Sequence, residues 1–171
     1  MDETAEREFT EFVNQRSHAL LRAAYALCGD QHSAEDLLQT ALAKAATKWS
    51  AIQGEAEHYV RRILYRDFVS AWRWRRRRPE HPTATPPERP GPGDLATDAA
   101  VRLQIRDALA TLPARQRAVL VLRYLEDLSE HQVAEILGCS TGTVGSQAAR
   151  ALAKLRHLEN PNRLIPKEVA S

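Results

Sequence analysis

The sequence predicts an all-α protein: two small helical domains joined by a flexible proline-rich linker, the second domain ending in a helix-turn-helix. Apolar residues recur at three- and four-residue steps through most of the chain, which is the spacing of one buried helix face. No segment shows the sustained alternation of a half-buried strand. Six of the nine prolines fall in residues 79–92, where they interrupt any regular structure.

The first domain is expected over residues 1–78. Phe9, Val13, Leu20 and Leu27 follow helical spacing, and Gly29 is a stop signal for this first helix. A second helix is expected to begin at Ser33, because Ser33 and Asp36 have the spacing of a capping box, and to run to about Lys48.

A third helical stretch has an apolar face that includes Val60, Leu64 and Phe68 and a basic face that includes Arg62 and Arg66. Its periodicity leaves open whether it is one helix or two joined near residues 67–70. Residues 61–78 contain eight arginines and one acid, a local charge of +7. Such a stripe fits a polyanion partner or a solvated arginine face, and charge alone does not separate the two.

The linker is expected over residues 79–98, the second domain over 99–158, and a tail of unknown role over 159–171. The second domain opens with a short amphipathic helix whose apolar face is Val101, Ile105, Ala108, Leu109 and Leu112. Pro113 suits the first turn of the next helix. The apolar run 118–122 could be a buried strand, but we interpret it as helix because it lies among helix formers.

The strongest local motif begins at Ser129, which can cap a short helix. Gly138 then supplies a left-handed turn, and a second helix follows Ser140. The small Ala134 allows the two helices to approach closely, and Val144 points inward from the second helix. This is helix-turn-helix spacing, although an ordinary helical hairpin uses the same turn residues.

The second helix of this motif directs polar and basic side chains outward. Hydroxyl and amide groups can hydrogen-bond base edges, while cations can bind phosphates. Residues 140–158 contain no acid, which fits docking on a polyanion. The outward residues are Thr143, Ser146, Gln147, Arg150 and Lys154.

Aromatic residues are interleaved with the arginines of the third stretch. Aromatic faces with adjacent cations capture unstacked bases at roughly 1 to 3 kcal/mol per base. Phe68 and Trp72 also lie on the apolar face, so a core role for them is equally open. Tyr65 and Trp74 are therefore the favoured stacking residues.

Composition argues against several other classes of protein. The chain has 43% hydrophobic and 27% charged residues, as expected for a folded soluble domain, and has no apolar run of membrane-spanning length. Its acidic start lacks the apolar core of a secretory signal, so a cytoplasmic location is expected. Cys28, Cys139 and the six histidines form no ligand cluster, and no phosphate-binding glycine loop is present. We therefore expect no metal, no cofactor and no catalytic residue.

Taken together, the two domains resemble the bacterial RNA polymerase sigma factors of the extracytoplasmic-function group. Residues 34–39 are similar to the segment that binds the clamp helices of the polymerase β′ subunit. Residues 59–64 and 72–78 are similar to the helices that melt and read the minus-ten element. Residues 112–119 resemble the opening of the fourth region and residues 133–156 its minus-35 reader. Residues 142–144, 146–147 and 151–156 are most similar to the actinobacterial SigE-type subfamily.

The resemblance implies that the chain directs promoter-specific transcription initiation. Its implied partners are core RNA polymerase, through the β′ clamp helices and the β flap, promoter DNA and, where one exists, an anti-sigma factor, with no membrane insertion. The implied polymerase contacts are Asp36, Leu37, Leu38, Gln39 and Leu42. The implied minus-ten contacts are Tyr65, Arg66, Asp67, Trp72, Arg73, Trp74, Arg75, Arg76, Arg77 and Arg78. Thr143, Ser146, Gln147, Arg150 and Lys154 are the implied minus-35 contacts.

Two further points follow from the resemblance. A flipped base would occupy a pocket around a loop near residues 66–70, where Asp67 would accept hydrogen bonds from base amino groups. Gly145 departs from the family pattern, which has a basic residue after the valine equivalent to Val144. The competing hypothesis is a stand-alone helix-turn-helix regulator whose first domain dimerises or senses a signal, but this leaves the +7 stripe unexplained.

Overall fold

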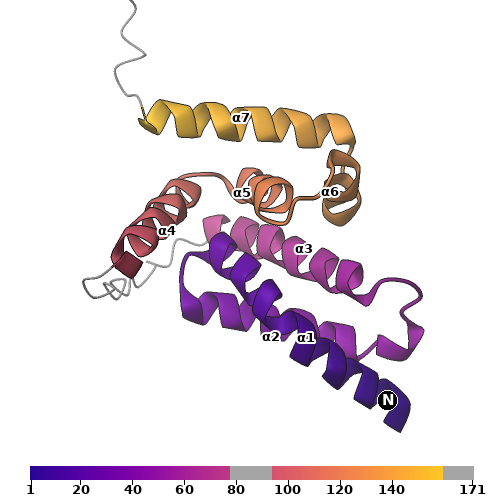
Figure 1. Ribbon diagram of the computed structural model, residues 1–171. Helices are drawn as coiled ribbons and strands as arrows, with labels where there is room; N and C mark the ends of the chain where they lie inside the picture. The colour runs from indigo at the N-terminus through magenta and orange to yellow at the C-terminus, as the bar shows by residue number, and fades with distance from the viewer. Residues whose placement is uncertain (78–93, 160–171) are drawn as a thin grey trace, which may run out of the picture.

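Every element in the described part of the chain is helical, as the sequence predicts. The computed structural model describes the backbone of residues 1–77 and 94–159 and the side chains of residues 1–71 and 99–159. The first lobe contains α1 (Glu3–Cys28), α2 (Gln31–Ala46), a short turn η1 (Trp49–Ala51) and α3 (Ala56–Arg77). The second lobe contains α4 (Asp94–Ala110), α5 (Ala114–Leu120), a π-helical turn η2 (Val121–Leu125), α6 (Glu130–Leu137) and α7 (Thr141–Glu159) (Figure 1).

The junction between α1 and α2 begins as predicted and then departs from the prediction. Gly29 ends α1 in the left-handed conformation, with φ 81°, which costs a glycine little. The cap of α2 is Asp30 rather than Ser33, because the Asp30 side chain accepts the Ser33 backbone N–H at 2.8 Å. The predicted Ser33 capping box is therefore wrong: an acceptor three residues earlier already satisfies this turn.

The third predicted stretch is one helix, α3, with no break near residues 67–70. Leu64, Tyr65, Phe68 and Val69 are all buried, so the inward-facing stripe continues through the expected break. The loop near residues 66–70 that the resemblance implied is therefore absent, and the segment is helical. A continuous buried stripe keeps the helix intact because a break would expose these side chains.

The start of the second lobe also differs from the prediction. α4 begins at Asp94, inside the segment 79–98 predicted as linker. Leu112 is buried as expected, but Val101 and Ile105 are 47% and 55% exposed. α4 instead approaches α1 through Arg106, whose side chain lies 3.8 Å from the position that a Cβ on Gly29 would occupy. The run 118–122 is helical, as predicted.

The two lobes pack on one another through a shared core. α3 contacts α5 and α6, and Figure 1 shows these two short helices lying between α3 and α7. Leu20 and Leu64 of the first lobe belong to the same buried cluster as Val119, Leu122 and Ile136 of the second. Burial of apolar side chains between the lobes therefore holds them together.

Candidate nucleic-acid and polymerase interface

The helix-turn-helix has the local structure that its sequence predicts. Ser129 and Gln132 form a reciprocal capping box at the start of α6. Gly138 ends that helix with φ 67°, a conformation that a side chain would penalise. Ala134 and Val144 are buried where the two helices meet, and the Ser140 hydroxyl accepts the Thr143 N–H at 3.1 Å. The motif is therefore rigidly set by its own caps and contacts.

The outer face of α7 presents most of the predicted minus-35 contacts. Ser146, Arg150 and Lys154 are exposed, while Thr143 and Gln147 are half-buried. Thr143 shares a 2.9 Å hydrogen bond with the Ser140 hydroxyl and so belongs partly to the cap. Lys154 donates to the Thr111 carbonyl at 2.8 Å, which ties α7 to the segment after α4. The Ser146 hydroxyl donates to the Thr143 carbonyl at 3.1 Å. Arg150 is therefore the most available of these groups for DNA, and Ser146 can still accept a hydrogen bond.

The predicted polymerase contacts on α2 divide into surface and core. Asp36 and Gln39 are exposed, and Leu37 and Leu42 are half-buried. Leu38 is only 6% exposed and belongs to the core, so its side chain cannot reach a partner in this arrangement. Asp36 and Leu37 line a hollow of about 500 Å³ that continues to α3. A partner helix could dock against this mixed polar and apolar surface.

The three predicted minus-ten contacts on α3 whose side chains the structure describes are engaged by other residues of the chain. Tyr65 is fully buried, and its hydroxyl donates to a Glu126 carboxylate oxygen at 2.7 Å. Burial first, and then the nearby Glu126 carboxylate, raises the pKa of Tyr65 well above its usual range. Arg66 donates to the Ile136 carbonyl at 2.9 Å. Asp67 forms a 2.7 Å ion pair with Lys44.

These contacts leave Tyr65 unavailable for stacking on a base in this arrangement. The side chains of Trp72, Arg73, Trp74 and Arg75–Arg77 lie outside the described residues, although their backbone continues α3. Arg78 lies outside them altogether. The remaining evidence for a nucleic-acid surface on the first lobe comes from the start of α3.

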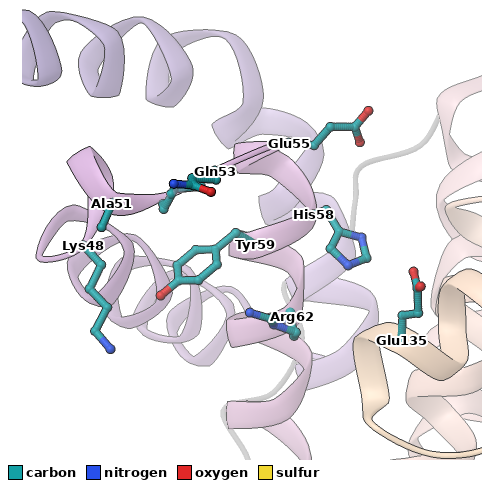
Figure 2. Close-up of a pocket in the computed structure, with 9 residues that line it drawn as sticks. Lys48, Ala51, Gln53, Glu55, His58, Tyr59, Arg62 and Glu135 are labelled. Carbon is teal, nitrogen blue, oxygen red and sulfur yellow. The ribbon is translucent and has the colours of Figure 1, made fainter.

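A hollow of about 650 Å³ opens beside the first turns of α3 (Figure 2). Tyr59, His58 and Arg62 line it from α3, and Lys48 lines it from the segment before η1. The Arg62 guanidinium carbon lies 5.5 Å from the centre of the Tyr59 ring. Glu135 faces the hollow from α6 in the second lobe. An aromatic face with nearby cations is the composition that holds an unstacked base and its phosphate.

Sequence reasoning missed the residues that join the lobes. Glu126 accepts hydrogen bonds from both Arg61 and Tyr65, and its side chain is 8% exposed. Arg117 is 4% exposed and donates to the carbonyls of Leu27 and Leu112 at 2.6 and 3.0 Å. No local pattern marks their role between the lobes, because Glu126 binds Arg61 and Tyr65, and Arg117 binds Leu27, over separations of 61 to 90 residues in sequence. Tyr59 and Arg62 could have been identified from the same aromatic and cationic interleaving that singled out Tyr65.

The described residues contain no cluster of histidine, cysteine and carboxylate side chains that could hold a metal ion. Among these residues, no helix has both the length and the apolar character needed to cross a membrane. Three surfaces of the described residues are suited to binding: α7, which contains no acid before Glu159, the mixed surface on α2, and the aromatic and cationic hollow on α3.

Two family models match the chain. The model described as Sigma-70 region 2 matches residues 12–78, and that described as Sigma-70, region 4 matches residues 102–155. The RNA polymerase sigma-E factor of Streptomyces coelicolor is 43% identical over 152 residues, which cover 87% of this chain and 84% of that relative. The ECF RNA polymerase sigma factor SigE of Mycolicibacterium smegmatis is 33% identical over 161 residues, covering 91% and 63%.

Solved structures of sigma factors also match this chain. The sigma factor RpoE from Bartonella quintana, solved in complex with the anti-sigma factor NepR, matches with a TM-score of 0.68 and 28% identity, over 92% of this chain and 99% of that one. CnrH, solved with the cytosolic domain of CnrY, has the same fold, with a TM-score of 0.66 and 22% identity over 92% and 90%. The chain therefore belongs to the sigma-70 family, in the extracytoplasmic-function group alongside the SigE-type sigma factors.

Proposed function

We propose that this chain binds core RNA polymerase and directs it to promoters, with the first lobe reading the minus-ten element and the helix-turn-helix binding the minus-35 element. The observation that carries this proposal is the presence, on one chain, of both sigma-70 regions with a built helix-turn-helix. In this proposal the chain acts by binding and positioning.

The second lobe supplies the duplex contact. α7 follows the rigid turn at Gly138, so it can enter a major groove while α6 crosses the backbone. Ser146 can hydrogen-bond a base edge, and Arg150 can bind a phosphate or a guanine. Thr143, Gln147 and Lys154, on the same face of α7, add further contacts to the DNA.

The first lobe supplies the polymerase contact and the melted-strand contact. Asp36 and Gln39 on α2 face the β′ clamp helices, with Leu37 and Leu42 beside them as the apolar part of the surface. Arginines 73 and 75–78 bind phosphates of the promoter, and Trp74 stacks on an exposed base. Tyr59 and Arg62 extend this contact along α3.

The proposed roles of the two lobes also imply further partners. The fourth-region lobe contacts the β flap of the polymerase while α7 holds the duplex. An anti-sigma factor is a further partner, since the relative RpoE was solved in complex with one. The chain works in the cytoplasm, where polymerase and promoter DNA are found.

The test measures promoter binding and runoff transcription on a library of promoters. It compares two samples, the chain alone and the chain with core polymerase. We expect specific binding and transcription only with core polymerase, because each lobe alone offers few contacts. Arg150→Ala should lower promoter occupancy about tenfold or more, whereas Arg22→Ala, an exposed arginine on α1, should not. Tight, specific duplex binding by the isolated chain would instead identify a stand-alone regulator.

A further inference from the structure

One carboxylate of the second lobe, that of Glu126, binds two donors of the first. Glu126 lies directly after η2 in the second lobe, and its two oxygens face α3 in the first. One oxygen accepts the Arg61 Nε–H at 3.1 Å, and the other accepts the Tyr65 hydroxyl at 2.7 Å. Arg61 also pairs with Glu57 at 2.8 Å, so it is held from both sides. Hydrogen bonds to a buried carboxylate are among the stronger polar contacts in proteins.

The turn that presents Glu126 has an unusual backbone. η2 is π-helical, and the Glu126 N–H bonds to the Val121 carbonyl five residues back, at 3.0 Å. The next residue, Asp127, has φ 53°, a left-handed conformation that is uncommon outside glycine. π-helical turns and left-handed residues of this kind cluster at functional sites, where surrounding contacts hold them in place. Relaxation of the turn to a regular helix would rotate Glu126 away from α3.

A second predicted promoter contact is engaged by the same lobe. Arg66 donates to the carbonyls of Ile136 at 2.9 Å and Glu135 at 3.4 Å, at the end of α6. Tyr65 and Arg66 are both predicted minus-ten contacts, and both are occupied by the second lobe. The closed arrangement therefore satisfies internally two of the groups that a promoter strand would otherwise bind.

We propose that Glu126 is a latch that holds the sigma factor closed by competing with single-stranded promoter DNA for the face of α3 around Arg61 and Tyr65. This inference rests on the proposed function of the first lobe. A carboxylate and a phosphate both satisfy the Arg61 guanidinium, so they exclude one another there. When the latch opens, the Tyr65 ring is exposed for stacking and the Arg66 guanidinium is released.

The latch residue can be changed in a way that penalises only the closed state. In Glu126→Ala the Tyr65 hydroxyl loses its acceptor while it is buried, whereas water satisfies it once the lobes separate. Glu126→Gln keeps the size of the side chain and removes its charge, which weakens the bond from Arg61. The matched control is Glu130→Gln, which removes the same charge from an exposed position in the same lobe.

The experiment uses the full chain without polymerase and has two readouts. Solution X-ray scattering measures the radius of gyration, and anisotropy of a short fluorescein-labelled oligothymidylate measures single-strand affinity, since base stacking tolerates any sequence. We expect Glu126→Ala and Glu126→Gln to increase the radius and tighten oligonucleotide binding about tenfold, the effect of losing a charge-assisted hydrogen bond. Glu130→Gln should leave the radius unchanged and alter affinity by less than about twofold.

Scattering curves for both Glu126 variants that superimpose on the wild type would overturn the latch. A larger radius of gyration without tighter oligonucleotide binding would show that Glu126 does not compete with DNA. Circular dichroism measures the helical content of each variant. If Glu126→Ala loses helical structure, the scattering and binding results for Glu126→Gln test the latch. The radius of gyration does not depend on polymerase, so failure of polymerase-dependent transcription would reject the proposed function while leaving the latch standing.

Discussion

Arg117 is the charged residue that lies deepest in the described part of the chain, at 4% exposure. Its guanidinium donates to carbonyls at the end of α1 and after α4, and it lies 5.7 Å from the centre of the Phe68 ring on α3. Burial lowers the pKa of Arg117, but an arginine stays charged at any physiological pH. A planar fork of donors suits this site, because it reaches several carbonyls from one position.

Replacing Arg117 with lysine should therefore lower the free energy of unfolding by about 2 to 4 kcal/mol, because an ammonium cannot span the same carbonyls and leaves buried acceptors unsatisfied. Urea denaturation measures the change. Arg115→Lys, two residues earlier, is the control and should change stability by less than about 1 kcal/mol. Equal effects of the two substitutions would show that the Arg117 hydrogen bonds contribute little.

The buried Tyr65 hydroxyl makes stability depend on pH in the alkaline range. The folded-state pKa of Tyr65 is raised by burial and by Glu126, with Arg61 opposing, while the unfolded value is about 10. The folded chain keeps this proton where the unfolded chain has lost it. The stabilisation is thus complete below about pH 10 and is lost as pH rises through the folded-state pKa.

We expect the unfolding free energy of the wild type to fall more steeply between about pH 9 and pH 11 than that of Tyr65→Phe, which has no proton to lose there. Urea titrations at several pH values provide the comparison, and the other tyrosines cancel because both proteins contain them. Parallel declines in the two proteins would contradict the buried, hydrogen-bonded state of Tyr65.

Gly145 has room for a side chain. A Cβ there would lie 3.8 Å from a Glu130 carboxylate oxygen, an ordinary contact distance. Gly145→Ala should stabilise α7 by about 1 kcal/mol, and Gly145→Lys should in addition tighten minus-35 binding in the holoenzyme through its charge. Duplex affinity and thermal stability of the two variants separate these effects. Weaker DNA binding by both variants with an intact fold would indicate that the glycine permits close approach.

At the scale of single elements, predictions succeeded where the determining contacts are local. Gly29, Ser129 and Gly138 end or begin helices as predicted, because a cap depends on residues within one turn. The predicted cap of α2 is wrong because Asp and Ser are both common N-cap residues, and only the backbone geometry shows that Asp30 is the cap. The exposure of Val101 was missed because it depends on how α4 meets α1.

The surface of α2 gives a prediction at this scale. Asp36→Ala combined with Gln39→Ala should weaken core polymerase binding about tenfold or more with no loss of helicity, because both side chains are exposed. Leu38→Ala should instead lower the unfolding free energy by about 2 to 5 kcal/mol, since Leu38 is a core residue. Polymerase affinity by fluorescence titration and urea denaturation distinguish the two. Unchanged affinity of the double variant would remove α2 from the interface.

At the scale of the whole molecule, the shared core was beyond sequence reasoning. The helices of each lobe are amphipathic, but their spacing does not show that Leu64 and Leu122 are buried in one cluster or that Tyr65 bonds to Glu126. The hydrogen bond that holds the buried Tyr65 hydroxyl joins residues that lie 61 positions apart in the sequence. The exposure of Ser146, Arg150 and Lys154 on α7 was predictable, because it depends only on the period of one helix.

A common core also predicts cooperative unfolding. Because side chains from both lobes are buried together, the chain should unfold in one calorimetric transition, with the van't Hoff enthalpy equal to the calorimetric enthalpy. Differential scanning calorimetry of the full chain tests this. Two resolved transitions in the wild type would mean that the lobes are energetically independent.

The turn glycine of the helix-turn-helix belongs to two structures at once. A Cβ on Gly138 would lie 3.0 Å from the Arg66 Nη2 atom of the first lobe, in addition to straining a backbone with φ 67°. If substitutions at Gly138 were scored only by transcription from a promoter, a loss of output caused by altered packing between the lobes would be mistaken for a loss of DNA recognition. A substitution at Gly138 therefore disturbs two things together, the turn that positions α7 and the contact of the Arg66 guanidinium with the end of α6.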